Sequence, residues 1–231
     1  MIEARVDELV PALEDSTLAL SSITIEDSAQ STLSRAEHDA LLFVARGSGS
    51  LTINGSGASL AAGTAGLVLA GEEARIAAAA DGLELICATV SADADRHAPI
   101  GARECLTRLA DADSEKATGA RSFQILFGPH NGSTRATIFA GYIPPGRAPW
   151  HYHLYDEIVW IPDGPGRLHI GDTTEELGPG ATFRLRPRQV HIVENLSAST
   201  EMTVIGIFTP AGSPSAAYLT PDVAAEYRFA G

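Results

Sequence analysis

The sequence predicts an all-β fold made of two tandem barrels joined by a short, partly helical linker. Three observations lead to this prediction. Short apolar runs separated by turn residues cover the chain from about residue 17 onward, the chain repeats itself at a shift of 117 residues, and a histidine–glutamate pattern occurs in the second copy only.

The apolar runs have the length and the punctuation of β-strands. Branched and aromatic side chains dominate them, and glycine, proline, asparagine or aspartate stands between them. Many short strands at such spacing are typical of a sandwich or barrel. The expected strands include residues 41–45, 50–54, 66–70, 83–90, 136–143, 157–161, 167–171 and 202–208.

Only residues 1–14 and about 102–118 have a helical pattern. We therefore expect an N-terminal barrel in residues 1–100, followed by the linker and a C-terminal barrel in residues 101–231.

Composition excludes several classes of protein. Of the 231 residues, 45% are hydrophobic and 19% are charged, as in a soluble globular protein. The net charge of −13 argues against nucleic acid and anionic membrane as partners. No apolar run reaches the roughly 20 residues of a membrane span, and the acidic start is no secretory signal. Cys87 and Cys105 do not make a disulfide framework. We expect a cytoplasmic location and a small-molecule ligand, and a homodimer is compatible with the sequence.

The repeat aligns residues 40–79 with residues 157–196 without a gap. Glycines and apolar residues agree at positions where a backbone turn or a core needs them. The matching pairs are Gly47 with Gly164, Gly49 with Gly166, Leu51 with Leu168, Ile53 with Ile170, Leu60 with Leu177 and Gly63 with Gly180. This indicates a duplicated β-unit.

The second copy carries a set of metal-binding residue types. His151 and His153 share one face of a strand because strand side chains alternate, and Glu157 has the same parity. His191 must come from a separate strand. Three imidazoles and one carboxylate form a donor set for divalent Fe, Mn or Ni, and Zn also fits. In the first copy these positions hold Ser34, Ala36, Ala40 and Ala74. The first copy has therefore lost the site.

These residues resemble the first motif of the cupin superfamily, G-x5-H-x-H-x3,4-E-x6-G. His151, His153, Glu157 and Gly164 fit it, whereas the preceding glycine, Gly146, stands one residue too close to the first histidine.

The second cupin motif, G-x5-P-x-G-x2-H-x3-N, is also present. Gly180, His191 and Asn195 have its spacing, but the proline is displaced by one to Pro187 and its second glycine is Gln189. These departures affect a turn and no ligand. The resemblance implies a bicupin of two jelly-roll (double-stranded β-helix) barrels, with a metal-binding C-terminal cupin and a degenerate N-terminal one.

The reaction is less well determined, because cupins include oxygenases, isomerases, decarboxylases and non-enzymes. The first hypothesis is a metal-dependent dioxygenase that oxidises a small organic anion such as a diketone, phenol or enol. In it Glu157 stays bound to the metal or is released to accept a proton. The second is a non-redox isomerase or decarboxylase in which the metal acts as a Lewis acid. The third is a binding or sensor protein without a reaction.

Three further residues are candidates for substrate binding. Arg184 and Arg186 lie on one side of an expected strand and can form a carboxylate clamp, a solvated face or a salt-bridged interface between the barrels. His169 can orient a ligand or lie exposed on the outer sheet.

Overall fold

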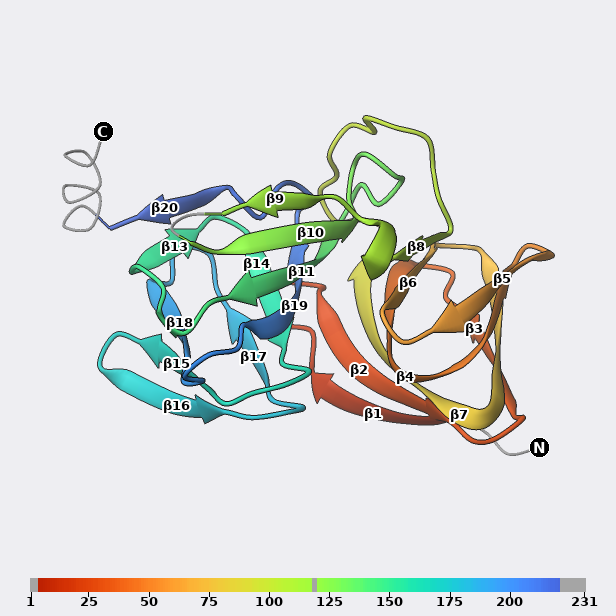
Figure 1. Cartoon of the computed structure of the whole chain (residues 1–231). Helices are drawn as coiled ribbons and strands as arrows, with labels where there is room; N and C mark the ends of the chain where they lie inside the picture. The colour runs from red at the N-terminus through yellow and green to blue at the C-terminus, as the bar shows by residue number, and fades with distance from the viewer. Residues whose placement is uncertain (1–3, 118–119, 221–231) are drawn as a thin grey trace.

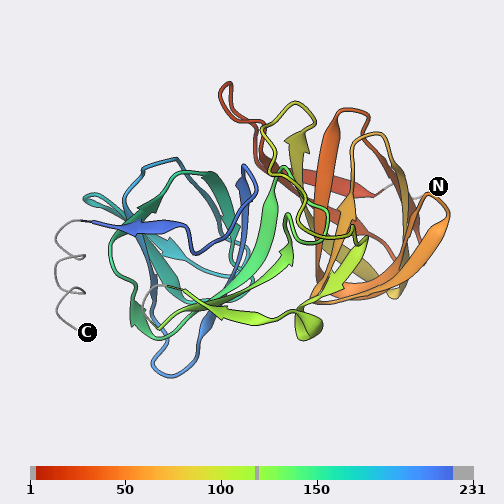
Figure 2. The ribbon, with the colours of Figure 1, turned by 90° about the horizontal axis from the view of Figure 1, so that it is seen from above.

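The computed structural model of the chain describes residues 4–117 and 120–220. Two β-units lie side by side, the N-terminal one on the right and the C-terminal one on the left in Figure 1, and the view from above in Figure 2 agrees. Among the described residues the one helical element is a single 3-10 turn, η1 (Leu109–Asp111). No helix within the same ranges is long and apolar enough to cross a bilayer.

The N-terminal unit is one eight-stranded sheet in the order β1-β2-β7-β4-β6-β8, with β3 added to β7 and β5 to β4. Its strands are β1 (Arg5–Val10), β2 (Ala19–Ile25), β3 (Gln30–Ser34), β4 (His38–Ile53), β5 (Ser56–Ala61), β6 (Thr64–Val68), β7 (Glu73–Ser91) and β8 (Leu106–Arg108).

The long strands β4 and β7 pair along most of their length and bend together near Gly47 and Gly82. Gly47 has a φ of +83°, and a Cβ there would lie 2.2 Å from the Gly82 carbonyl oxygen. Only glycine permits this approach, and the bend lets two strands serve both layers of the unit.

The C-terminal unit has two six-stranded sheets. One runs β17-β14-β19-β11-β10-β9, and the other runs β16-β15-β18-β13-β20 with β12 added to β18. The strands are β9 (Ser114–Lys116), β10 (Ser122–Phe127), β11 (Thr137–Ile143), β12 (Gly146–Arg147), β13 (His151–His153), β14 (Asp156–Trp160), β15 (Gly166–Ile170), β16 (Thr173–Leu177), β17 (Thr182–Leu185), β18 (His191–Asn195), β19 (Met202–Thr209) and β20 (Ala217–Leu219).

The strand arrangement obeys the repeat. Shifted by 117 residues, β1 falls on β10, β2 on β11, β5 on β16 and β6 on β17. In the same register β4 covers β14 and β15, and β7 covers β18 and β19. The pairings correspond as well, since β2 pairs with β7 as β11 pairs with β19. The duplication therefore extends beyond the residues that the sequence alignment covers.

The helix predicted in residues 1–14 is wrong, and within residues 102–118 the helical part is limited to the 3-10 turn η1 (Leu109–Asp111). Within residues 1–14, of which 1–3 lie outside the described residues, Arg5–Val10 forms a strand that pairs with β2. Within residues 102–118, β8 pairs with β6, and β9 pairs with β10. Local helix propensity is a weak preference that sheet pairing overrides.

The barrels are also open, because every sheet ends in two edge strands.

A shared apolar core joins the units. Leu41, Phe43 and Leu67 of the N-terminal unit belong to one buried cluster with Ile158 and Ile207 of the C-terminal unit. The face of β14 that points away from its own unit therefore packs on the N-terminal sheet. Burial of apolar area on this scale is the main force holding the two units together.

The interior of the N-terminal unit is filled. Ala40 and Ala74, at the positions of Glu157 and His191, lie fully buried in an apolar cluster with Leu42, Leu51 and Ile76. Small aliphatic side chains at these two positions pack into the apolar core, where the C-terminal unit has a carboxylate and an imidazole.

Candidate metal centre

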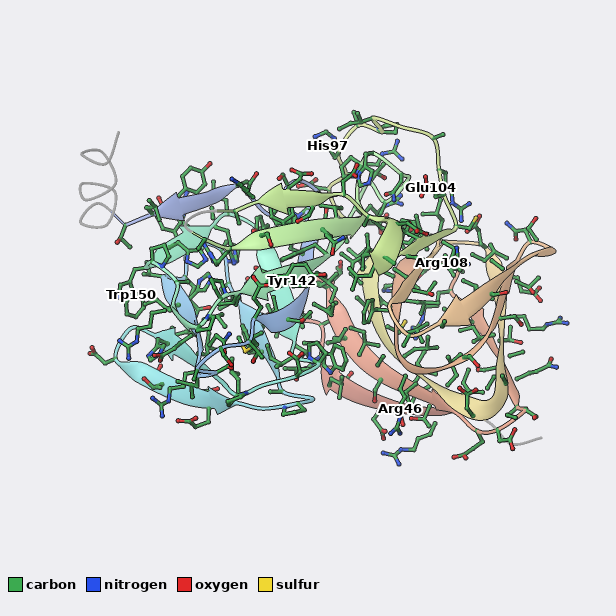
Figure 3. The ribbon with its side chains drawn as sticks, in the orientation of Figure 1. Arg46, His97, Glu104, Arg108, Tyr142 and Trp150 are labelled. Carbon is green, nitrogen blue, oxygen red and sulfur yellow. The ribbon has the colours of Figure 1, made fainter. Side chains whose placement is uncertain are left out.

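The structure brings His151, His153, Glu157 and His191 together inside the C-terminal unit. The two histidines of β13, the glutamate of β14 and the histidine of β18 come from both sheets of the unit. His151 is paired directly with His191 across β13 and β18. All four side chains are buried, with 2–6% of their residue surface exposed. Trp150, the residue before His151, lies at the end of the C-terminal unit away from the N-terminal unit (Figure 3).

The four side chains line one cavity and lie close together. The ring centroids of His151 and His191 lie 4.3 Å apart, and those of His153 and His191 lie 5.1 Å apart. Nε2 of His153 is 2.9 Å from Oε2 of Glu157. Polar groups packed this closely in an apolar interior need a common partner to offset their desolvation.

Backbone carbonyls fix the orientation of all three rings. Nδ1 of His151 lies 2.8 Å from the oxygen of Pro149, Nδ1 of His153 lies 2.9 Å from the oxygen of Tyr155, and Nδ1 of His191 lies 2.8 Å from that of Gln189. A carbonyl oxygen only accepts, so each Nδ1 carries the hydrogen and donates it. In the neutral imidazole this leaves the Nε2 lone pair free to bind a cation.

The environment keeps two of the rings neutral. Burial, and to a lesser degree the neighbouring His191 and Arg121, lowers the pKa of His151 to about 2. Burial also lowers the pKa of His191 to about 4, against the opposing effect of its hydrogen bond to Gln189. Neutral imidazole is the form that binds metals. Both rings are therefore in the protonation state that metal binding requires at neutral pH.

The contact between His153 and Glu157 fits a bound cation. The buried Nε2 of His153 makes no hydrogen bond of acceptable geometry, although Oε2 of Glu157 is only 2.9 Å away. If the ring is neutral with its hydrogen on Nδ1, Nε2 and Oε2 are two lone-pair atoms that repel at this distance, and a cation bound to both removes the repulsion. Adjacent donors at about 2.1 Å from one octahedral ion are separated by about 3.0 Å. The observed distance matches that separation.

The remaining donors have not converged to the same degree. Among residues 4–117 and 120–220, no three His, Cys, Asp or Glu side chains already surround one point as a finished metal site. The donor types, the ring tautomers and the His153–Glu157 distance fit a divalent ion.

A cavity of about 90 Å³ adjoins the cluster. It is smaller than the roughly 300–1,000 Å³ of sites for drug-sized ligands. Its walls are mainly apolar and come from β10, β11, β14, β17, β18 and β19. The apolar side chains that line it are Phe123, Phe139, Ile143, Val159, Leu185, Val193 and Val204. The cavity therefore has room for a small molecule in mostly apolar surroundings beside the cluster.

Gly206 of β19 makes room for the carboxylate of Glu157. A Cβ at position 206 would lie 2.7 Å from Oε1 of Glu157 and 2.3 Å from the Phe139 ring. Neither approach is possible for a real side chain, so this glycine lets β19 pass directly behind the glutamate.

Arg121 is a cavity residue that sequence reasoning missed. It precedes β10, lines the cavity and places Nη1 3.4 Å from Nε2 of His151. The N–H of Ala117 donates to the Arg121 carbonyl across the β9–β10 turn. No motif marks this residue, which stands thirty positions before His151 beside a stretch that we expected to be helical. Only the strand pairing brings it to the site.

The structure places Arg184 and Arg186 outside the cavity, so the carboxylate-clamp interpretation is corrected. Both point to the boundary between the units, where Arg184 donates to the carbonyl of Pro11 at 2.8 Å. The buried Asp156 lies between the two arginines. Its carboxylate is 3.3 Å from Nε of Arg184 and 3.4 Å from Nη1 of Arg186. The Ser16 hydroxyl also donates a hydrogen bond to this carboxylate, at 2.6 Å. The salt-bridged interface, one of the three alternatives, describes them.

His169 does not reach the cavity either. Its Nε2 is 2.8 Å from the carboxylate of Glu194, and its Nδ1 is 3.2 Å from the Thr174 hydroxyl. Glu194 in turn pairs with Arg147. His169 therefore belongs to a polar cluster on the outside of the β15–β18 sheet and contacts no member of the metal-ligand set in these interactions.

The sequence matches the Cupin domain family over residues 140–208, which contain all four members of the cluster. No curated protein matches the sequence.

Solved structures match almost the whole chain. A formate complex of Lactobacillus farciminis oxalate decarboxylase has a TM-score of 0.77 at 13% identity and covers 96% of this chain and 86% of its own. A variant of Bacillus subtilis oxalate decarboxylase OxdC has a TM-score of 0.75 at 13% identity, covering 99% and 80%. A structure of the Bacillus enzyme from work on its Mn(II) centres has a TM-score of 0.72 at 13% identity. It covers 94% of this chain and 76% of its own. The all-β jelly-roll fold of cupin type is thereby confirmed.

Proposed function

We propose that the chain is a metal-dependent enzyme for a small organic anion, with one divalent transition metal ion held by His151, His153, Glu157 and His191. The observation that carries this proposal is the arrangement of the three rings, each of which donates its Nδ1 hydrogen to a backbone carbonyl and so presents Nε2 as an acceptor, with Nε2 of His153 2.9 Å from the buried carboxylate of Glu157. Manganese, iron and nickel suit this donor set, and zinc also fits.

The bound ion supplies a Lewis acid and, for a redox-active metal, an electron-transfer centre. The protein supplies the rest. The carbonyls of Pro149, Tyr155 and Gln189 hold the rings in one orientation. The apolar walls exclude water, which strengthens charge interactions inside the cavity. Glu157 is the residue that can hold a proton at the cluster.

Two reaction classes are candidates. An oxygen-dependent reaction of dioxygenase type is the expectation from three histidines and one carboxylate. An oxygen-independent reaction, such as decarboxylation, is supported by the likeness to oxalate decarboxylases with Mn(II) centres. Both need the same small, mostly apolar cavity beside the ion.

The first experiment is elemental analysis of untagged protein, followed by calorimetric titration of the metal-free form with Mn²⁺. We expect about one ion per chain in the wild type and almost none in His153→Ala. A wild type that binds no Mn²⁺, Fe²⁺, Ni²⁺ or Zn²⁺ would overturn the proposal.

The second experiment decides between the reaction classes. Oxygen uptake and carbon dioxide release are measured with metal-loaded protein and a panel of small carboxylates, diketones and phenols, in air and under anaerobic conditions. Turnover only in air supports the dioxygenase type, and equal turnover without oxygen supports the Lewis-acid type. A tightly held small molecule that is never converted would make the chain a binding protein.

A further inference from the structure

The ring of Tyr155 lies flat against the imidazole of His153. Their centroids are 4.1 Å apart, and their planes differ by 8°. Of the rings in residues 4–117 and 120–220, only that of Tyr155 is stacked face to face on one of the three histidines. The contacts of His151 and His153 with His191 are inclined instead, at 55° and 64°. The plane of the His153 imidazole therefore follows the plane of Tyr155.

A second ring holds Tyr155 in place. Phe208 of β19 also stacks on it, with the centroids 3.9 Å apart and the planes at 22°. Two rings this close cannot share one face, so Tyr155 lies between His153 and Phe208. Phe208 is fully buried and is the cross-strand partner of Glu157 in the β14–β19 pairing. The stack therefore connects His153 to a rigid part of the sheet that also carries the glutamate.

The backbone of Tyr155 constrains the same imidazole in a second way. Its carbonyl accepts the Nδ1 hydrogen of His153 at 2.9 Å. This hydrogen bond fixes the position of Nδ1 but leaves the ring free to turn about the N–H···O direction. The stacked ring removes that freedom, because aromatic pairs have preferred geometries. Together the two contacts set the direction of Nε2, which lies 2.9 Å from Oε2 of Glu157.

The N-terminal unit has no such stack. Shifted by 117 residues, His153 and Tyr155 fall on Ala36 and His38. In the neighbouring strand Thr89 pairs with Ala40, as Phe208 pairs with Glu157. The strand pairing is thus kept in the copy without metal donors, whereas the outer two rings are replaced by alanine and threonine. The fold does not need the sandwich, which occurs together with the donors.

We infer that Tyr155 is a positioning residue of the metal site: held between His153 and Phe208, its ring fixes the plane of the imidazole and directs Nε2 toward the Glu157 carboxylate and the ion. The inference rests on the proposed function, since it concerns a ligand of that ion. It assigns the role to the ring. The hydroxyl makes only a long contact, 3.5 Å, with the carbonyl of Pro214.

The test is calorimetric titration of the metal-free full chain with Mn²⁺. Every variant keeps the backbone carbonyl at position 155, so the side chain alone is tested. Tyr155→Leu should bind Mn²⁺ about tenfold or more weakly, because groups that orient a metal ligand are worth roughly 10–100-fold in affinity. Tyr155→Phe keeps the ring without the hydroxyl, and its affinity should stay close to that of the wild type.

The matched control is Tyr152→Leu. Tyr152 is adjacent to His153 and stacks on another tyrosine, the half-exposed Tyr218, with centroids 5.4 Å apart. This pair lies on the outer face of the sheet, because Tyr152 alternates with the inward-facing histidines. The variant removes a stacked tyrosine one residue from His153 and should keep the wild-type Mn²⁺ affinity.

Phe208→Leu provides a second variant in case Tyr155→Leu does not fold. It removes the far ring of the sandwich and leaves Tyr155 and its carbonyl in the chain. Mn²⁺ should bind to it more weakly than to the wild type, and more tightly than to Tyr155→Leu. Urea denaturation of each metal-free variant shows whether it is native under the conditions of the titration.

NMR of the metal-free protein separates ring positioning from loss of the fold. Two-dimensional ¹⁵N–¹H spectra of the imidazoles report which nitrogen carries the hydrogen and how mobile the ring is. In the wild type, His153 should give a narrow Nδ1–H signal. In Tyr155→Leu this signal should broaden while that of His191 persists, and in Tyr152→Leu both should persist.

The outcomes distinguish this inference from the proposed function. Full Mn²⁺ affinity in Tyr155→Leu or Phe208→Leu, an equal loss in Tyr152→Leu, or an equal loss in Tyr155→Phe would each overturn the inference while the metal site stands. An unchanged His153 signal in metal-free Tyr155→Leu would do the same. A wild type that binds none of Mn²⁺, Fe²⁺, Ni²⁺ and Zn²⁺ would overturn the proposed function and, with it, the role of Tyr155 in metal binding.

Discussion

Replacing Gly206 by alanine tests whether the backbone of β19 positions Glu157, the carboxylate of the proposed metal site. The added methyl group would lie 2.3 Å from Cε1 of Phe139 and 2.7 Å from Oε1 of Glu157. Carbon atoms in good contact are about 3.5–4.0 Å apart, so the ring must retreat by about 1.2 Å or more. The carboxylate has to move as well, because β19 is paired on both sides, with β11 and with β14.

Two magnitudes follow from this geometry. Overpacking of a full core costs about 1–3 kcal/mol of folding free energy. Displacing a metal ligand from its supported position costs roughly 10–100-fold in affinity, or about 1.4–2.7 kcal/mol. Gly206→Ala should therefore lose both stability and Mn²⁺ affinity, measured by urea denaturation of the metal-free protein and by calorimetric titration.

Gly141→Ala is the matched control. A Cβ at position 141 would meet Val204 at 2.9 Å and the Phe139 ring at 3.3 Å, and its nearest neighbours include no atom of Glu157. This variant should be destabilised by packing strain and keep an Mn²⁺ affinity close to that of the wild type. Equal affinity losses in both variants, or full affinity in Gly206→Ala, would refute the role of Gly206 in placing Glu157.

Three other predictions concern separate parts of the chain. His191→Ala should remove most of the bound metal by elemental analysis, whereas a polar substitution at the corresponding alanine of the N-terminal unit should leave the metal content unchanged; equal losses would contradict the asymmetry of the two copies. Asp156→Ala leaves the nearly buried guanidinium of Arg184 without its carboxylate and should cost about 3 kcal/mol in urea denaturation, the low end for a buried pair; a loss near zero would show that the interface tolerates the charge. Burial raises the pKa of Cys87 to about 11, so at pH 8 an aromatic disulfide reagent should label only the exposed Cys105 in the native protein and both thiols in denaturant; rapid native labelling of two thiols would disprove this burial.

Strand periodicity accounts for what could be predicted at the site. His151 and His153 are both buried while Tyr152 between them is partly exposed, as the alternation of side chains requires. The parity of Glu157 was less informative, because Asp156 is buried too. β14 is covered on both faces, with Glu157 toward the cavity and Asp156 toward the N-terminal unit, and no local pattern distinguishes the two environments.

The helix predictions failed for a related reason. Residues 102–118 have a locally helical composition, yet β8 and β9 complete sheets whose other strands are far away in the sequence. Pairing with β6 and β10 gives hydrogen-bond partners to the backbone groups of β8 and β9. The local sequence does not show that these partners exist. The same holds for β1, which pairs with β2 at the edge of the N-terminal sheet.

By itself the sequence determined the all-β duplicated fold and the set of four side chains that meet in the C-terminal unit, because glycine spacing and strand alternation are local properties. Only the tertiary structure decided what surrounds them. It brought Arg121 to the cavity beside the paired strands β9 and β10, and it turned Arg184 and Arg186 toward Asp156 at the boundary between the units. These are contacts between segments remote in sequence, and their partners are chosen by packing and burial, which no residue spacing records.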